Sequence, residues 1–238
     1  MCPMKKILII LFLMFVCSVC YAEAVSFLAE DEISTEFVPL PPKPEEASFY
    51  NDWQRYQWGK TMRNTERGKQ AVADAAFTLD YLAKIYTRPF GMEISEKNTP
   101  EIWALLDRVF VTAALCKDKA KRRIMRNRPF VQFNEPTQIP EDEKVLRDNS
   151  SYPSGHTTQG WAIALVLAQI NPERQDAILK RGFEYGESRV IVGFHFQSDV
   201  DAARTITSTL INRLNVNEDF KQQLAKAKAE FLQKKGNN

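Results

Sequence analysis

Cysteine is nearly absent from this chain. Four cysteines occur in 238 residues, and three of them, Cys2, Cys17 and Cys20, lie close to the start. If the first segment is removed, Cys116 alone remains, so neither an intramolecular disulfide nor a cysteine-based metal site can form. A protein without disulfides must be stabilised by its hydrophobic core, and the length is sufficient for one sizeable domain.

Neither sign of charge is in clear excess. Lysine and arginine total 32 and aspartate and glutamate total 30, a formal net charge of +2. Lys5 and Lys6, both in the first segment, account for the difference. Proteins that bind nucleic acids usually carry a strong basic excess. We therefore expect no nucleic-acid partner, and any basic feature must be local.

Long apolar runs are absent except at the start, where the chain reads "MCPMKKILIILFLMFVCSVCYA". Two lysines precede an apolar run, and the segment closes with a small residue, Ala22. This pattern is typical of a secretory signal peptide. We predict that residues 1–22 are cleaved on export and that the mature protein is periplasmic.

The alternatives to cleavage are a transmembrane anchor and a lipid anchor. A transmembrane anchor is disfavoured because the apolar run is shorter than the roughly 20 residues that a spanning helix needs. A lipid anchor on Cys17 or Cys20 is disfavoured because bulky residues, Val16 and Val19, precede both cysteines. No later stretch is apolar for long enough to span a bilayer, so we expect no membrane association after cleavage.

Strand patterns are also scarce, whereas helical periodicity recurs along the chain. Residues 23–46 are rich in proline ("FVPLPPKPEEA") and are predicted to be an extended arm. Residues 47–238 are predicted to form one all-α domain, a helical bundle. Within it we expect one helix break near Asn64 and Thr65, and a turn at 88–91. Further helices are expected over 100–128, 157–170, 171–193, 199–214 and 218–235. In the first of these, Thr99 is expected to cap the first turn and Pro100 to open it.

The first of three candidate site clusters is basic. Lys121 and Arg128 in "KRRIMRNRPF" are seven residues apart, which places both on one face if the helix continues to Pro129. Most basic runs are solvated helix faces. The functional interpretation is a pair of cations that hold a phosphate dianion, because the arginine fork matches two oxygens and lysine adds a point charge.

The second cluster is "PSGH", at the mouth of the apolar helix expected from residue 157. Unpaired amides and the helix dipole favour an anion there, Ser154 adds a hydroxyl, and Gly155 permits close approach of the backbone. His156 completes the cluster. An ordinary capped helix with an incidental histidine is the alternative interpretation.

The third cluster contains the second of only two histidines in the chain. Asp199 follows His195 by four residues, a spacing that lets the carboxylate hold the proton on one ring nitrogen and leave the other free. Arg189 could add a third cation. A surface or capping pair is the alternative, and a zinc site is disfavoured because two histidines are too few ligands.

Together the clusters read Lys121-x6-Arg128-Pro129, Pro153-Ser154-Gly155-His156 and Ser188-Arg189-x5-His195-x3-Asp199. This pattern resembles the tripartite signature of the PAP2 acid phosphatase and vanadium haloperoxidase superfamily. The stretch from Tyr152 to Gly193 further resembles the bacterial class A non-specific acid phosphatases, which include periplasmic apyrases.

The resemblance implies an all-α fold and a metal-independent phosphomonoesterase that works through a phosphohistidine. His195 would be the nucleophile, Asp199 would orient it, and His156 would act as acid and then as base. The phosphate would be bound by Lys121, Arg128, Ser154, Gly155 and Arg189. Partners would be small phosphate esters, vanadate-like oxyanions would inhibit, and no cofactor is implied. A homodimer and the identity of the ester stay open.

Four other functions are alternatives to this one. The same site could hydrolyse nucleoside di- and triphosphates, as an apyrase does, or oxidise halide with bound vanadate. A serine hydrolase built on Ser154, His195 and Asp199 lacks the expected Gly-x-Ser-x-Gly motif. A non-catalytic helical protein would not need both histidines. Because His156 must be protonated to act as an acid, we expect a rate optimum on the acid side of neutrality.

Overall fold

The computed structural model describes residues 25–236, and these contain ten α-helices, two one-turn 3₁₀ helices and no strand. The predicted all-α fold class is confirmed. The predicted signal peptide lies outside the described residues. The elements are η1 (Glu30–Glu32), α1 (Phe49–Met62), α2 (Glu66–Ala73), α3 (Leu79–Phe90), α4 (Pro100–Arg123), α5 (Pro129–Gln132), α6 (Pro140–Leu146), α7 (Gly155–Ile170), η2 (Pro172–Arg174), α8 (Gln175–Ile191), α9 (Gln197–Leu214) and α10 (Glu218–Gly236).

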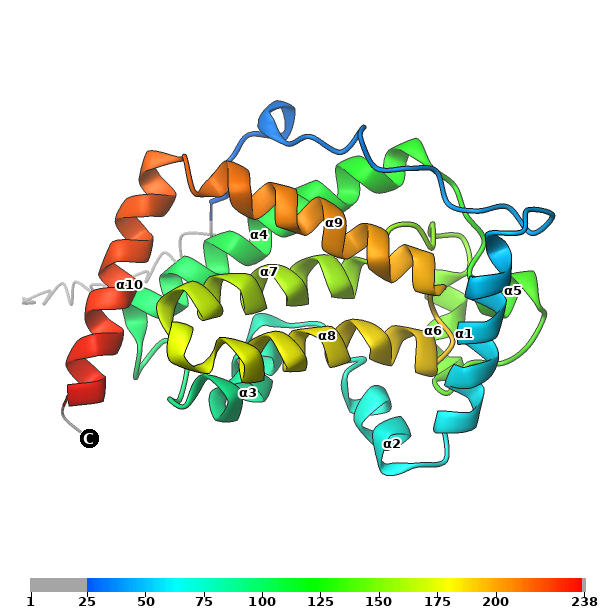
Figure 1. The fold of residues 1–238 in the computed structure, drawn as a ribbon, viewed down its shortest axis with the longest axis horizontal. Helices are drawn as coiled ribbons and strands as arrows, with labels where there is room; N and C mark the ends of the chain where they lie inside the picture. Colours follow the sequence, from blue (N-terminus) through cyan, green and yellow to red (C-terminus); the bar gives the residue numbers. More distant parts are fainter. Residues whose placement is uncertain (1–24, 237–238) are drawn as a thin grey trace, which may run out of the picture.

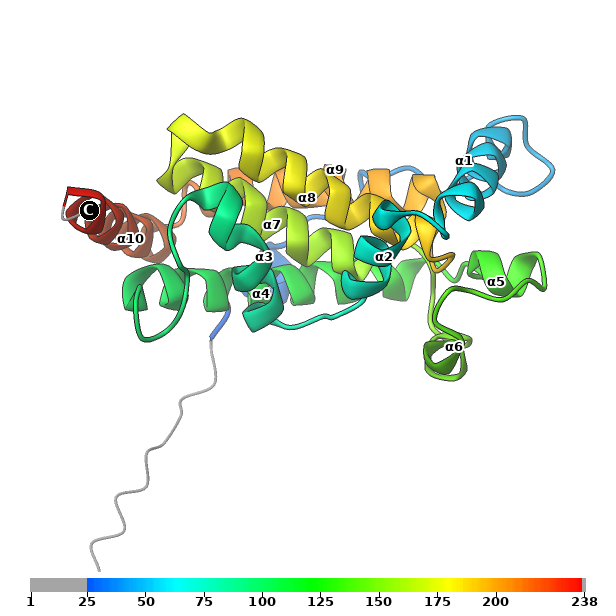
Figure 2. The same cartoon turned by 90° about the horizontal axis from the view of Figure 1, so that it is seen from below.

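Four long helices, α4, α7, α8 and α9, run lengthwise through the molecule (Figure 1). Helix α10 crosses one end, and α1, α5 and α6 lie at the other (Figures 1 and 2). At that second end, α4 and α8 finish and α7 and α9 begin. The positive ends of two helix dipoles therefore meet there. Among residues 25–236, no helix combines the length and apolarity needed to cross a bilayer.

Helix α7 is the centre of the core, because α4, α8 and α9 all pack against it. Glycines let α7 and α8 approach closely. A Cβ atom built on Gly160 would lie 2.4 Å from the Tyr185 ring, and one on Gly182 would lie 2.7 Å from the Cβ of Ala164. The apolar pattern of α7 follows from burial on most of its sides.

The amino-terminal helical region has two breaks where the sequence predicted one. The expected break lies between α1 and α2, but a second loop covers 74–78 before α3. Thr78 caps α3 by accepting a hydrogen bond from the Tyr81 amide at 3.2 Å. Asp74 is fully buried and accepts hydrogen bonds from Arg181 and Ser188 of α8. These tertiary bonds fix the loop, and helical periodicity does not reveal them.

One further prediction about an irregular segment was wrong. The expected turn at 88–91 is the last turn of α3, which ends at Gly91 in a left-handed conformation with φ of 82°. Pro89 lies in that last turn, where the carbonyls of Arg88 and Pro89 accept hydrogen bonds from Arg174. The segment between α4 and α7 is mostly irregular and contains two short helices, α5 and α6, which open with Pro129 and Pro140 at positions where a missing N–H is harmless.

The helix starts at Pro100 and Gly155 agree with the sequence to within two residues. Thr99 occupies the position before α4 but makes no capping bond to it, since its hydroxyl bonds to Ser95 instead. Likewise the side chain of Asn171 donates to the Phe90 carbonyl at 2.8 Å and does not cap α8.

The proline-rich segment runs along the α4 and α9 side of the bundle towards α1 (Figure 1). Apart from the single turn η1, its described residues are irregular. Ile33 and Val38 are buried, Tyr152 donates to the Pro39 carbonyl at 2.6 Å, and Lys119 donates to the Ile33 carbonyl at 2.6 Å. The segment is therefore packed against the domain along its length.

Candidate active site

The turn between α8 and α9 brings Arg189 and His195 together. Gly193 has a φ of 93°, which reverses the chain directly after α8. The amides of Phe194 and His195 then both donate to the carbonyl of Arg189, at 3.1 and 3.2 Å. A tight turn therefore fixes the distance between two residues of the third cluster.

The imidazole of His195 is 2% exposed and has a defined tautomer. Its Nε2 atom lies 3.1 Å from Nη1 of Arg128, and a guanidinium can only donate. Nε2 is therefore the acceptor, and the ring proton is on Nδ1. Nδ1 faces Oδ2 of Asp199 at 3.4 Å, and the hydroxyl of Ser151 at 3.3 Å. The aspartate thus holds the proton on the side away from Arg128.

This environment keeps His195 neutral. Burial, followed by the charge on Arg128, lowers the pKa of the imidazole to about 3, although Asp199 acts in the opposite direction. Burial alone would raise the pKa of the Asp199 carboxyl, but Arg126 and the bonds from His195 and Ser151 hold it well below its usual range. At neutral and mildly acid pH the pair is a carboxylate beside a neutral ring with a free lone pair.

Lys121 and Arg128 do not share a helix face, contrary to the sequence prediction. Helix α4 ends at Arg123, and Arg128 has extended backbone before α5. The reason is tertiary: the Ser151 amide donates to the Arg126 carbonyl at 2.9 Å, and the Ser150 hydroxyl donates to the Ile124 carbonyl at 2.6 Å. Pairing with the segment before α7 thus replaces the last helical turns.

The two cations nevertheless converge on one place. The Lys121 ammonium and the Arg128 guanidinium both donate to the carbonyl of Ser150. Arg128 also donates to the Phe194 carbonyl at 3.1 Å. Burial, with the charge of Arg128 next, lowers the pKa of Lys121 to about 7, and burial together with Arg189 lowers that of Arg128 to about 10. Crowded buried cations of this kind favour a bound anion.

Arg189 gives the clearest sign of an anion. Its side chain is 1% exposed, and its Nε and Nη1 atoms have no hydrogen-bond partner among residues 25–236. Its guanidinium lies 5.1 Å from the centre of the Phe194 ring. A buried charged donor without a partner is destabilising. A phosphate oxygen is a partner that would satisfy it.

Ser154 and Gly155 begin α7 as the sequence indicates. The Ser154 hydroxyl accepts from the Thr157 hydroxyl at 2.9 Å and from the Thr157 amide at 3.4 Å, so its own proton is available for donation. A Cβ on Gly155 would meet Cδ of Lys117 at 2.7 Å. Ser154 makes no bond to His195, and the serine hydrolase alternative has no dyad in the structure.

His156 is held by the loop 74–78. Its Nε2 atom lies 3.0 Å from the carbonyl of Ala75, which can only accept, so Nε2 carries a proton. The ring stacks on Phe77 with centroids 4.1 Å apart and planes at 20°. Burial, followed by the charge on Arg189, holds the pKa of His156 well below its usual range, and His195 and Arg128 act in the same direction. The charge on Arg128 thus lowers the pKa of both histidines.

The predicted residues thus gather at one end of the bundle from four helix ends and two loops. The set supplies cations, a hydroxyl, a helix amide and two imidazoles, which suits a tetrahedral oxyanion. Within residues 25–236, no three His, Cys, Asp or Glu side chains gather closely enough to hold a metal ion.

Five contributors to this site were missed by sequence reasoning. Ala75 and Phe77 could not be found because the loop carrying them was read as helix. Ser151 is two residues before the second cluster, and its hydroxyl donates to Asp199 at 2.5 Å. The remaining two, Arg126 and Asp52, bond to each other behind Asp199. Arg126 lay inside the basic cluster, whereas no local signal marks Asp52.

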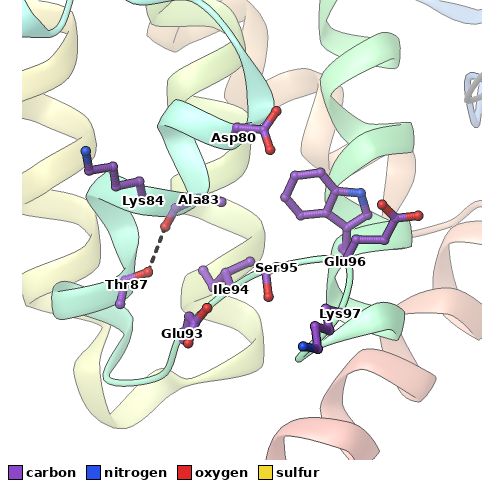
Figure 3. Close-up of a pocket in the computed structure, with 10 residues that line it drawn as sticks. Asp80, Ala83, Lys84, Thr87, Glu93, Ile94, Ser95, Glu96 and Lys97 are labelled. Atoms are coloured by element: carbon purple, nitrogen blue, oxygen red, sulfur yellow. Dashed lines mark hydrogen bonds between the residues drawn. The ribbon is translucent and has the colours of Figure 1, made fainter.

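A separate cavity of about 560 Å³ lies between α3, the following loop and the start of α4 (Figure 3). Its lining mixes Asp80, Glu93 and Glu96 with Lys84 and Lys97. None of the residues from the three clusters lines it. The mixture of charges shows no preference for an anion, so this cavity is not part of the site.

Comparison with known proteins identifies several relatives. Residues 102–216 match the PAP2 superfamily. The chain is 47% identical to the non-specific acid phosphatase of Providencia stuartii over 212 residues, which cover 88% of this chain and 86% of that protein. It is 40% identical to the non-specific acid phosphatase of Salmonella typhimurium over 207 residues (86% and 83%), and 33% identical to the acid phosphatase of Zymomonas mobilis over 195 residues (82% and 74%).

Proposed function

The chain belongs to the PAP2 superfamily and is an acid phosphatase, and from this premise we propose that it cleaves phosphate monoesters through a phosphohistidine on His195. The observation that supports this mechanism most strongly is the pairing of Arg189 and His195. A buried guanidinium with two partnerless donors lies in the same turn as a neutral imidazole whose Nε2 carries a lone pair.

In the first step, the lone pair on Nε2 of His195 attacks phosphorus, and the bond from phosphorus to the ester oxygen breaks. The imidazole becomes positively charged, and the Asp199 carboxylate beside Nδ1 stabilises that charge. Arg128 moves its hydrogen bond from Nε2 to a phosphate oxygen. The negative charge on the other phosphate oxygens is bound by Arg189, Lys121, the Ser154 hydroxyl and the Gly155 amide.

The departing oxygen needs a proton, and His156 supplies it. Its Nε2–H is held by the Ala75 carbonyl, so the proton for the leaving group is carried on Nδ1. A bound dianion raises the pKa of His156 from its low value in the free protein. In the second step, Nδ1 accepts a proton from water as the water attacks phosphorus and the phosphorus–nitrogen bond breaks.

We also propose that the enzyme acts after export to the periplasm. The support for this is the pattern of charge and apolar residues over 1–22. Vanadate should inhibit, because it readily adopts the five-coordinate geometry of phosphoryl transfer and carries the charge that these cations bind.

The roles of the two histidines are separated by changing the leaving group. In His156→Ala, the rate with an alkyl phosphate such as glycerol phosphate should fall about 100-fold or more, since a positioned acid contributes roughly that factor. The rate with p-nitrophenyl phosphate should fall far less, because p-nitrophenolate leaves without a proton. Both rates are measured as kcat/KM, from initial rates at substrate concentrations well below KM, because kcat/KM reports the first step and excludes the base role of His156 in the second.

His195→Ala is the comparison variant. Its activity on both substrates should fall to the same extent, because the nucleophile is removed. An equal loss on the two substrates in His156→Ala would contradict the acid role of His156. Full activity in His195→Ala would contradict the proposed mechanism as a whole.

A further inference from the structure

A buried chain of charges lies directly behind His195. Asp52 of α1 is 1% exposed, Asp199 is fully buried, and the side chain of Arg126 is 9% exposed. Arg126 belongs to the segment between α4 and α5, so three separate parts of the chain meet here. Neither Asp52 nor Arg126 is part of the three motifs, and the steps of the reaction do not use them.

The guanidinium of Arg126 bridges the two carboxylates. Its Nη1 donates to Oδ1 of Asp199, and its Nη2 donates to Oδ2 of Asp52 at 2.7 Å. Its plane is further fixed by the Phe196 ring, whose centre lies 4.2 Å from the guanidinium carbon. The planar guanidinium fork can hold two carboxylates at a fixed separation, whereas an ammonium group is a point charge without a fixed donor geometry.

Asp52 is itself anchored on the other side. Its Oδ1 accepts from the Ser198 amide at 2.8 Å, and its Oδ2 accepts from the Ser198 hydroxyl at 2.5 Å. Ser198 directly precedes Asp199 in the first turn of α9. Asp52 therefore fixes both the guanidinium and the backbone that carries Asp199, so the position of this carboxylate depends on α1.

The other oxygen of Asp199 is the one that faces the ring. Oδ2 accepts from the Ser151 hydroxyl at 2.5 Å and from the Phe196 amide at 2.8 Å, and lies 3.4 Å from Nδ1 of His195. With Oδ1 held by Arg126, the carboxylate cannot rotate. The carboxylate that faces the imidazole is therefore fixed on both oxygens, by Ser151 and Phe196 on Oδ2 and by Arg126 on Oδ1.

We propose that Arg126 and Asp52 are positioning residues, and that the chain Asp52–Arg126–Asp199–His195 keeps the imidazole proton on Nδ1 and Nε2 free to attack. This inference rests on the proposed function of His195. It also explains why two carboxylates and an arginine are buried together, although a buried ion-pair network is by itself weak evidence for stability.

The test compares Arg126→Lys with Arg123→Lys. Lysine keeps the charge at 126 but lacks the planar fork that holds the two carboxylates at a fixed separation. Arg123 lies in the last turn of α4 and donates to the Thr35 carbonyl of the arm at 2.5 Å, away from Asp199. It therefore controls for the loss of an arginine fork in this region.

Two measurements are made on each protein: kcat and KM for p-nitrophenyl phosphate, and the ring tautomer of His195 from long-range proton–nitrogen NMR spectra. Only two imidazoles contribute to those spectra, and His156→Ala identifies their signals. In Arg126→Lys we expect kcat to fall about 10- to 100-fold, as is typical when an orienting partner is lost, with KM nearly unchanged. We expect a mixture of tautomers in place of Nδ1–H alone.

Asp52→Asn provides an independent route if Arg126→Lys does not fold, and it should change kcat and the tautomer in the same direction. Wild-type tautomer and kcat in a folded Arg126→Lys or Asp52→Asn protein would overturn the inference, whatever the change in stability. A wild-type protein that has the Nδ1–H tautomer but no phosphatase activity would instead contradict the proposed function.

Discussion

At the scale of single residues, the site holds two neutral imidazoles among buried cations. The pKa of His195 is lowered to about 3, first by burial and then by Arg128, and that of His156 is also well below its ordinary value. Burial and the neighbouring arginine charges leave a lone pair on His195 at acid pH. They also make protonation of both rings unfavourable in the free protein. In the proposed mechanism, a bound dianion offsets this cost and raises the pKa of His156, so that its ring carries a second proton on Nδ1.

This arrangement predicts that the free protein loses stability in mild acid. The unfolded chain takes up a proton on His195 near pH 6.5, whereas the folded protein does so only near pH 3. The unfolded state therefore binds more protons between these values. The contribution of His195 to the free energy of unfolding is fully present above pH 6.5 and is lost as the pH falls. At pH 5 the loss from this residue is about 2 kcal/mol.

The measurement is urea unfolding between pH 7 and about pH 5, where most carboxylates stay ionised, in buffer without phosphate or sulfate. His195→Gln should have a shallower dependence of the unfolding free energy on pH than the wild type. The same slope in both proteins would show that His195 is not held neutral in the folded state.

The motif residues could be predicted from the sequence, but their supports could not. The types and spacing of His156, His195 and Asp199 indicate phosphate chemistry without any coordinates. Asp52 lies far from them along the chain and reaches the site only through the packing of α1 against α9. Such a residue has no local pattern, because its role is set by tertiary contacts.

At the scale of the elements, the site depends on the close contact between α7 and α8. Gly160→Ala would place a methyl group 2.4 Å from the Tyr185 ring, so the helices must separate or the ring must move. We expect this change to lower the free energy of unfolding by about 1–3 kcal/mol despite the better helix propensity of alanine. Denaturant unfolding measures the loss.

Gly236→Ala is the matched control, since a Cβ there has no neighbour within 4 Å, and it should leave stability nearly unchanged. Equal stability of Gly160→Ala and the wild type would mean that α7 and α8 are not packed as closely as described.

Helix periodicity predicted most of the long elements, and it failed where tertiary bonds override it. The ends of α7, α9 and α10 agree closely with the sequence because their apolar faces and turn residues coincide. The end of α4 was placed too late, since pairing of 124–126 with the segment before α7 replaces the helix. The loop 74–78 was missed because its ordering depends on bonds from α8 to Asp74.

At the scale of the whole molecule, the proline-rich arm completes the core. Ile33 is 2% exposed within the main hydrophobic cluster, whereas Leu40, also on the arm, is 72% exposed. We expect Ile33→Ala to lower the free energy of unfolding by about 2–5 kcal/mol and Leu40→Ala to change it by less than about 0.5 kcal/mol. Similar, small effects of both would show that the arm is not part of the folded core.

The central claim, that the phosphoryl group is transferred to His195 before water receives it, concerns the whole site acting in sequence. The stereochemical course at phosphorus tests it without requiring an intermediate to accumulate. A phosphate monoester made chiral at phosphorus with oxygen isotopes is cleaved by the wild-type enzyme in the presence of an alcohol acceptor, and the configuration of the transferred group is determined. Two in-line displacements invert the centre twice, so we predict retention. Inversion would mean a single direct attack on phosphorus and would contradict the account.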